Sequence, residues 1–358
     1  MHDRAGTGSG KAGRSPATTV TASAMATGQS VEPVDTVPIG EIDLAAMPPG
    51  RKWRCWLQVA TGLRQPVMVP FVVARGVSPG PTVFAVAGVH GNEYEGMEAI
   101  RATFAALDVG RLAGTFAGIP VANPYAYAAR SRTTPLEIDG LNLARIFPGN
   151  PDGSPSAVLA DHLFRLIGRS LGPDDLLIDF HSGSAEVAFA TIVGVRAPAS
   201  PARARSEAAA RHFGLPALWE IPDSRGPLNA ETTRAGIPTI GTETTGRAGF
   251  DARGFAALGM GLARVMAYLG MIASEQAPVA ATGPFRPTRE MLAPSSGFFR
   301  TSLKLHDEVE AGELLGSLVD IFGDRVAEIQ SPCAGSVWAV RETCAVESGE
   351  TLCYIALR

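Results

Sequence analysis

Apolar runs that alternate with helix-length segments organise most of the chain. Two β-rich runs between residues 51 and 73, WRCWLQV and PVMVPFVVA, flank the turn-like TGLRQ and predict a hairpin or a pair of neighbouring strands. The apolar run PTVFAVAGVHG then ends in glycine, and a helix-length segment with spaced apolar positions follows from Glu93 to Leu107. This order predicts a unit of strand, loop and helix.

The same alternation continues through the middle of the chain. It predicts an α/β fold in which a parallel or mixed sheet is covered by helices. The predicted strands lie around Gly118–Ala122, at Leu176–Phe180, and near Ala190–Val193, Leu218–Ile221 and Thr239–Glu243. The predicted helices lie at about Ser156–Leu171, Ala202–Phe213 and Gly254–Leu269.

Beyond residue 275 the pattern changes to short β segments separated by glycines. Gln276–Pro287 is rich in Ala, Pro and Thr, which is typical of a linker, and the segments that follow predict a small all-β domain. The chain has 358 residues, more than the roughly 100–200 of a typical single domain. We therefore expect a disordered tail at 1–35, an α/β domain at 36–275 and a β-rich domain at 288–358.

Composition and charge exclude several classes of function. The net charge is -4, and lysine and arginine are scattered, so no basic surface for a nucleic acid is expected. No apolar stretch is long enough to span a bilayer. The first 35 residues lack the apolar run of a secretory signal. We therefore expect a cytoplasmic location and no membrane partner.

Two segments place potential metal ligands just beyond the ends of predicted strands. GVHGNEYEG contains His90 and Glu93 in H-x-x-E spacing, and in LLIDFHSG His181 follows directly on a second strand. The crevice at the carboxyl ends of strands is the usual binding site of an open α/β sheet. Two histidines and one carboxylate are a typical catalytic zinc set. A single histidine is more often a core residue, but groups at successive strand ends favour a metal site.

A further carboxylate is expected at the same edge of the sheet. Glu243 ends the predicted strand in AGIPTIGTETTGRAG, just before a loop that contains glycine. A carboxylate beside a metal can take a proton from the attacking water and pass it to the departing amine. We therefore predict that Glu243 is a general base. The alternative interpretation is a solvated surface glutamate.

Taken together, these motifs resemble those of the succinylglutamate desuccinylase/aspartoacylase family, a branch of the zinc carboxypeptidase superfamily. GVHGNEYEG, DGLNLARIFPG, IDFHSG and IPTIGTE occur in the family's order, and the likeness extends from about Pro66 to the C-terminus. The resemblance implies a carboxypeptidase-like mixed sheet flanked by helices, with a smaller C-terminal all-β domain. It also implies hydrolysis of an N-acyl bond in a small amino-acid derivative, with one zinc ion per subunit.

The resemblance also implies roles for individual residues. Arg132 corresponds to an arginine that polarises the scissile carbonyl, and Arg145 to one that binds a substrate carboxylate; a permanently charged guanidinium suits both roles. Arg130 is close enough in the sequence to compete with Arg132, and Asn142 is a further substrate-binding candidate. The metal and the acid/base chemistry are assigned to the residues named above: His90, Glu93 and His181 as zinc ligands, and Glu243 as the catalytic base.

Three departures from the family pattern stand out. Relatives commonly have asparagine where this chain has Ala144, so an amide that would help to hold the substrate is missing. Relatives often have an aspartate in place of Asn142, where it would orient a ligand histidine, and Asp139 is close enough to take that part. The segment Thr244–Gly246 replaces a glycine-rich run.

The predicted function is therefore deacylation of a small N-acyl amino acid or a related N-acyl amine. One alternative is a zinc carboxypeptidase or amidase that acts on peptide-like substrates in a longer cleft. Another is a binding protein that retains the fold without catalysis, which Ala144 makes conceivable. The expected partner is a small molecule, and a homo-oligomer is conceivable because the β domain could cover a neighbouring subunit's site.

Overall fold

The computed structural model describes residues 34–60, 65–196, 200–247, 249–273 and 280–358, all of which belong to one compact unit. The tail predicted at 1–35 lies outside the described residues up to residue 33. Most of the TGLRQ turn and residues 276–279 of the predicted linker also lie outside them. In the described part, no helix is long and apolar enough to cross a membrane.

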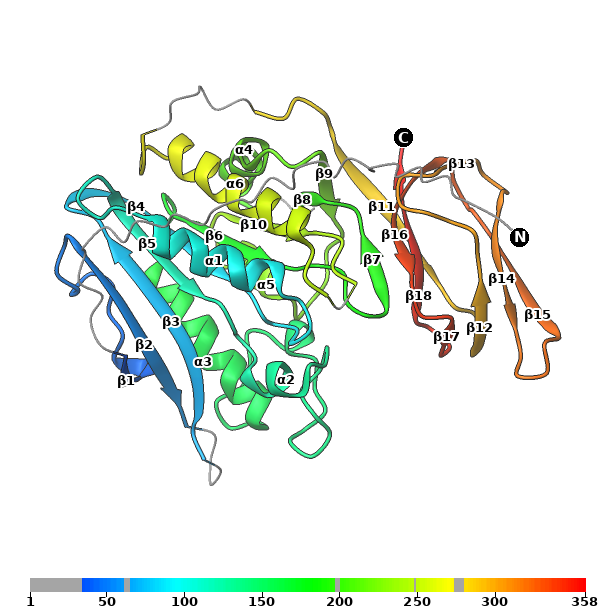
Figure 1. Cartoon of the computed structure of the whole chain (residues 1–358), viewed down its shortest axis with the longest axis horizontal. Helices are drawn as coiled ribbons and strands as arrows, with labels where there is room; N and C mark the ends of the chain where they lie inside the picture. The colour runs from blue at the N-terminus through cyan, green and yellow to red at the C-terminus, as the bar shows by residue number, and fades with distance from the viewer. Residues whose placement is uncertain (1–33, 61–64, 197–199, 248, 274–279) are drawn as a thin grey trace, which may run out of the picture. The chain divides into compact units, whose positions relative to one another are not determined.

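One mixed sheet of fourteen strands runs through this unit (Figure 1). In pairing order its strands are β1 (Asp35–Pro38), β2 (Arg51–Val59), β3 (Val67–Arg75), β5 (Ala113–Ile119), β4 (Ser78–Val86), β6 (Leu176–Phe180), β10 (Thr239–Glu243), β8 (Ile192–Arg196), β9 (Ala217–Ile221), β11 (Phe285–Leu292), β18 (Thr351–Leu357), β16 (Gly335–Arg341) and β13 (Glu308–Val309). The short strand β7 (Val187–Phe189) pairs with β16.

Helices cover both faces of the sheet. They are α1 (Glu95–Ala106), α2 (Pro124–Ala129), α3 (Pro155–Ser170), α4 (Arg203–Phe213), α5 (Leu228–Arg234) and α6 (Ala252–Tyr268), with 3-10 helices η1 (Ile39–Glu41) and η2 (Leu143–Arg145). The apolar residues of α1, α4 and α6 pack into one core cluster, and those of α3 and α5 pack into another. The predicted α/β fold class is confirmed.

The C-terminal part is antiparallel β structure that continues the large sheet. β11 pairs in parallel with β9 through Phe285–Pro287 and then antiparallel with β18 from Thr288 onward. A second sheet is formed by four strands, in the order β15 (Arg325–Gln330), β14 (Leu314–Val319), β12 (Gly297–Arg300) and β17 (Ala345–Val346).

The structure differs from the sequence-based expectation in several segments: β5 lies at Ala113–Ile119 rather than around residues 118–122, helix α2 was not predicted, and β11 and α5 differ as well. β11 begins at Phe285, inside the segment expected to be a linker, because Phe285 packs against the core and the Arg211 guanidinium lies 4.9 Å from its ring centre. The short helix α5 was not predicted, since all of its residues except Arg234 are buried. A helix that is buried on nearly all sides shows no amphipathic period. The predicted pairing of the two runs is confirmed, because β2 and β3 pair antiparallel.

Two glycines of α6 provide a matched test of this packing. A methyl group on Gly261 would lie 2.1 Å from the Phe213 ring of α4, whereas one on Gly259 would meet no atom within 4 Å. We expect Gly261→Ala to destabilise the fold by about 1–3 kcal/mol through overpacking, and Gly259→Ala to stabilise it by about 0.5–1 kcal/mol through helix propensity. Urea unfolding measures both changes; the same sign for both variants would contradict this account.

Candidate active site

Three parallel strands end at one edge of the sheet and bring the predicted site residues together. β4, β6 and β10 are neighbours in the sheet, with β4 parallel to β6 and β6 parallel to β10. His90 and Glu93 lie in the loop after β4, His181 directly follows β6, and Glu243 is the last residue of β10. The site therefore forms at the carboxyl ends of the strands, where an open α/β sheet places its ligands.

Close packing fixes the loop that carries the first two of these residues. A methyl group on Gly91 would lie 2.0 Å from the backbone of Ala126 in α2, so only glycine fits between them. The backbone N–H of Gly91 donates to the carbonyl of Ser131 at 2.9 Å. His90 and Glu93 are consequently buried, with 2% and 4% of their surface exposed.

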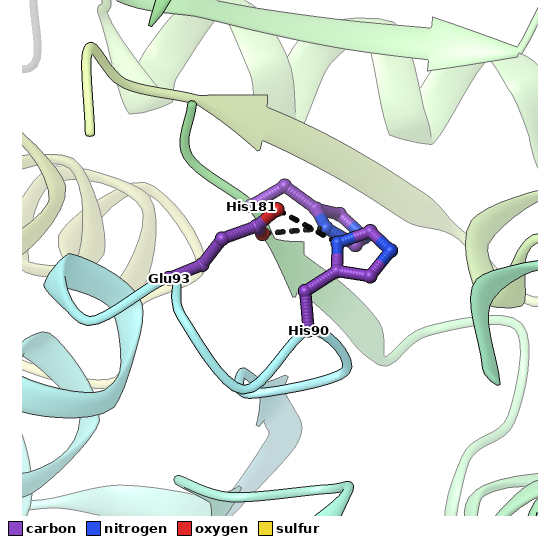
Figure 2. A group of neighbouring side chains, drawn as sticks. All are labelled: His90, Glu93 and His181. Carbon is purple, nitrogen blue, oxygen red and sulfur yellow. Dashed lines mark hydrogen bonds and ion pairs between the residues drawn. The ribbon is translucent and has the colours of Figure 1, made fainter. Parts of the chain in front are cut away.

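His90, Glu93 and His181 form a compact cluster around the Glu93 carboxylate (Figure 2). Nδ1 of His90 lies 2.7 Å from Glu93 Oε1, and Nδ1 of His181 lies 3.0 Å from Glu93 Oε2. One potential ligand atom from each residue lies within 4.8 Å of the others. Two imidazole nitrogens and a carboxylate oxygen at such separations are a donor set that suits a tetrahedral divalent cation.

The outer ring nitrogens of both histidines also face oxygen atoms. Nε2 of His90 lies 3.2 Å from Asn142 Oδ1, and Nε2 of His181 lies 3.4 Å from Asp179 Oδ1. Metal-binding histidines commonly donate their second N–H to an oxygen, which orients the ring. Asn142 therefore contacts a histidine of the cluster, whereas Asp139 bonds to Ser156 instead.

Charge and burial shift the pKa values in the cluster. Burial, followed by the charge of Arg132, lowers the pKa of His90 to about 4. Burial opposes ionisation of Glu93, but the two histidines outweigh it and hold its pKa well below the usual range. Burial also opposes protonation of His181, but Asp179 and Glu93 raise its pKa well above the usual value. The cluster thus favours a charged carboxylate between a neutral ring at His90 and a protonated ring at His181.

Arg132 and Glu243 complete the inner part of the site. Nη1 of Arg132 donates to Glu93 Oε1 at 3.1 Å, and a third of its side chain remains exposed. Oε2 of Glu243 is buried and has no hydrogen-bond partner among the described residues. Burial raises the pKa of Glu243 to about 8; His181 and Arg132 oppose this rise, and Glu93 adds to it.

The site opens into a cavity of about 680 Å³. Arg145 lines this cavity with the cluster, whereas Arg130 does not: Arg130 is exposed and its backbone caps the end of α2. The other wall includes Glu290, Arg341 and Tyr354 from the C-terminal strands.

Sequence reasoning missed several residues of the cavity. Arg196, at the end of β8, lines it together with Asn229 of α5. The sequence offers one signal for Arg196, because an arginine at the end of an apolar strand, IVGVR, lies where site residues are expected. The wall residues of the C-terminal strands have no local motif, so nothing in the sequence pointed to them.

Comparisons with known proteins agree with this architecture. The model of the succinylglutamate desuccinylase/aspartoacylase catalytic domain matches residues 79–269. The N-alpha-acetyl-L-2,4-diaminobutyric acid deacetylase of Halomonas elongata is 28% identical over 307 residues, which cover 81% of this chain and 86% of the relative.

Solved structures extend the likeness to both parts of the chain. A product-bound structure of the ectoine utilization protein EutE (DoeB) from Ruegeria pomeroyi has a TM-score of 0.77 and 26% identity, covering 87% of this chain and 98% of that one. A succinylglutamate desuccinylase/aspartoacylase from Rhodobacter sphaeroides has a TM-score of 0.77 and 25% identity, with coverages of 88% and 97%.

The raised pKa of Glu243 predicts a pH-dependent cost to stability. Between the ordinary value of 4.5 and the folded value of about 8, the folded protein binds the proton more tightly than the unfolded chain, so stability falls as pH rises through this window. Glu243→Gln removes that cost. The measurement is Tm with a chelator present. The Tm of Glu243→Gln minus that of wild type should be several degrees larger at pH 8.5 than at pH 5, since a change of one kcal/mol in the free energy of unfolding shifts Tm by roughly 2–4 °C.

Glu98→Gln in α1 provides the control for this measurement, because the half-exposed carboxylate of Glu98 pairs with Arg101 and lines no part of the cavity. Its difference from wild type should not change with pH. If the difference between Glu243→Gln and wild type is the same at both pH values, Glu243 does not carry a raised pKa.

Proposed function

The chain belongs to the succinylglutamate desuccinylase/aspartoacylase family, and from this membership we propose that it is a zinc-dependent deacylase of small N-acyl amino acids or related N-acyl amines. The observation that supports the proposal most directly is the convergence of His90, Glu93 and His181 with the unpartnered Glu243 carboxylate at one edge of the sheet. The Halomonas elongata relative is a deacetylase by name, which supports the same reaction class.

In this proposal His90, Glu93 and His181 hold one zinc ion. The donor chemistry fits, because the two Nδ1 atoms and a Glu93 oxygen converge while both Nε2 atoms face outer oxygens. When bound, zinc would supply Lewis acidity that polarises the scissile carbonyl and acidifies water. The remaining steps belong to the side chains of this protein.

Glu243 moves the proton. As a base, its carboxylate takes a proton from the attacking water; as an acid, the same group delivers that proton to the nitrogen of the departing amine. The raised pKa of about 8 supports this double role, because a group that titrates near neutral pH can both accept and release a proton. A nearby cation would favour the ionised form and bring this pKa down.

Two arginines orient the substrate. Arg132 is partly exposed to the cavity beside Glu93, so its guanidinium can donate to the carbonyl oxygen as negative charge develops there. Arg145 lines the cavity and bonds only to the carbonyl of Ala144 among the described residues. It is therefore available to bind the carboxylate of the amino-acid part of the substrate. This role does not require the amide that is missing at Ala144.

The proposed activity predicts hydrolysis of one class among N-acetyl, N-succinyl and N-formyl amino acids and diamines. Glu243→Ala should lower kcat by about 10²–10⁴-fold, the usual contribution of general acid/base catalysis. Release of free amine measures turnover. Glu98→Ala, on the exposed face of α1, is the matched control and should keep wild-type activity. An unaltered kcat in Glu243→Ala would remove Glu243 from the mechanism, and inactivity of wild type on the whole panel would refute the proposed function.

The metal assignment makes a separate prediction. Purified protein should contain about one zinc per chain by atomic emission, and added zinc should raise the Tm of chelator-treated protein, because a ligand that binds only the folded state stabilises it. His181→Ala should lose both properties. His212→Ala is the control, since His212 lines no part of the cavity. Its ring stacks on that of Tyr268, with 3.7 Å between the ring centres. Retention of stoichiometric zinc by His181→Ala would contradict the ligand set.

A further inference from the structure

Glu95 is a buried carboxylate without a cationic partner. It is the first residue of α1, and none of its surface is exposed. The backbone N–H of Asp251, 156 residues away in the chain, donates to its Oε1 at 2.7 Å. Its Oε2 is buried and has no hydrogen-bond partner among the described residues, and no described cation forms an ion pair with it. A buried carboxylate is costly, so groups other than an ion-pair partner must stabilise it.

Two helix N-termini supply that stabilisation. Glu95 lies in the first turn of α1, and Asp251 is the residue that caps the N-terminus of α6. The N-terminus of a helix carries a partial positive charge and N–H groups without a partner inside the helix, and both favour a carboxylate. Because the N-termini of α1 and α6 meet at Glu95, the carboxylate is stabilised there without a cation.

The contact replaces a capping interaction that α6 cannot make for itself. In a capping box, a glutamate at the third helical position accepts the backbone N–H of the capping residue. In α6 that position is Gly254, where even a methyl group would lie 2.9 Å from Cβ of Thr244, so a longer side chain would displace Thr244. Glu95, from another helix, accepts this N–H instead. The start of α6 therefore depends on a residue of α1.

Gly254 also connects this contact to the proposed general base. Cβ of Thr244 and Oδ2 of Asp251 both lie against Gly254, at 2.9 and 2.8 Å from the position of an added methyl group. Thr244 is fully buried and directly follows Glu243. The hydrogen bond from Asp251 to Glu95 thus fixes one end of a segment whose other end sets the direction of Glu243.

The backbone of the first turn of α1 supports the metal cluster by separate contacts. Glu93 lies two residues before Glu95 in the chain. A methyl group on Gly96 would lie 2.5 Å from Cβ of Phe180, and His181 follows Phe180 directly. These contacts do not involve the side chain of Glu95. Loss of its carboxylate should therefore disturb the segment after β10 and leave the proposed ligands in place.

We propose that Glu95 is a positioning residue, whose carboxylate fixes the start of α6 and thereby the place of Glu243 beside the metal cluster. This inference rests on the proposed function, in which Glu243 transfers the proton. Glu95 does not line the cavity, so it acts through Glu243 and not on the substrate.

The first test compares variants of Glu95 on a substrate that wild type hydrolyses. Glu95→Ala removes the acceptor and should lower kcat by roughly 10–100-fold, because a displacement of about 1 Å can cost that much. KM should stay within a few-fold of wild type, and zinc should be retained. Glu95→Gln keeps an oxygen that can accept the Asp251 N–H and should recover most of the lost kcat. Glu98→Ala, in the same helix, is the matched control and should keep the wild-type kcat.

A double-mutant cycle distinguishes positioning from general damage. If Glu95 acts through Glu243, Glu95→Ala should lower kcat in wild type but not in the Glu243→Ala background. Damage to the whole fold or to the metal cluster would lower the residual activity in both. Equal fold-losses in the two backgrounds, or a wild-type kcat in zinc-loaded Glu95→Ala, would overturn the proposal. Glu95→Met fills the same space without a carboxylate, and it serves in the cycle if Glu95→Ala does not fold.

A measurement without turnover separates this inference from the proposed function. With a chelator present, the effect of Glu243→Gln on Tm should depend less on pH in the Glu95→Met background than in wild type, because a displaced Glu243 loses part of the burial that raises its pKa. Inactivity of wild type on every substrate refutes the proposed function, and the Tm comparison then decides the role of Glu95 alone. A smaller pH dependence supports that role, and the same dependence in both backgrounds overturns it.

Discussion

The carboxylate of Glu93 is the contact on which the rest of the site depends. Its two oxygens meet both histidine Nδ1 atoms and Arg132, and Oε2 also accepts the backbone N–H of Ser182 at 3.2 Å. This single buried group joins the loop after β4 to the end of β6. Because the two histidines outweigh the effect of burial, the pKa of Glu93 stays low, and a negative charge lies at the centre of the cluster.

The geometry of the cluster follows from features that the sequence displays. Strands with continuous apolar runs are buried, and the polar residues that follow them must gather at the edge where parallel strands end. His90, Glu93, His181 and Glu243 all obey this rule, so their convergence could be predicted without coordinates. The orientation of the His90 ring could not be read from a local pattern, because it depends on a contact with Asn142, which is 52 residues away in the chain.

The parts that escaped prediction depend on long-range packing. Asn229 and Arg196 meet only because α5 packs over the sheet, and α5 has no amphipathic pattern to reveal it. Tyr354 and Glu290 reach the cavity because β11 and β18 continue the large sheet, although both strands look like ordinary β segments in the sequence. Local patterns report which face of an element is buried, but not which distant element covers it.

The continuity of the large sheet through β11 limits how the chain can be divided by an engineer. β11 uses its first residues to pair with β9 and the rest to pair with β18, so a cut at the nominal boundary near residue 288 would split one strand between two fragments. The three residues left on β9, Phe285–Pro287, would form a short edge strand without the rest of β11, and edge strands of this kind pair with other chains. A chimera that exchanges the cavity wall between relatives would therefore need its junction before Phe285, so that the whole strand moves with the wall it supports.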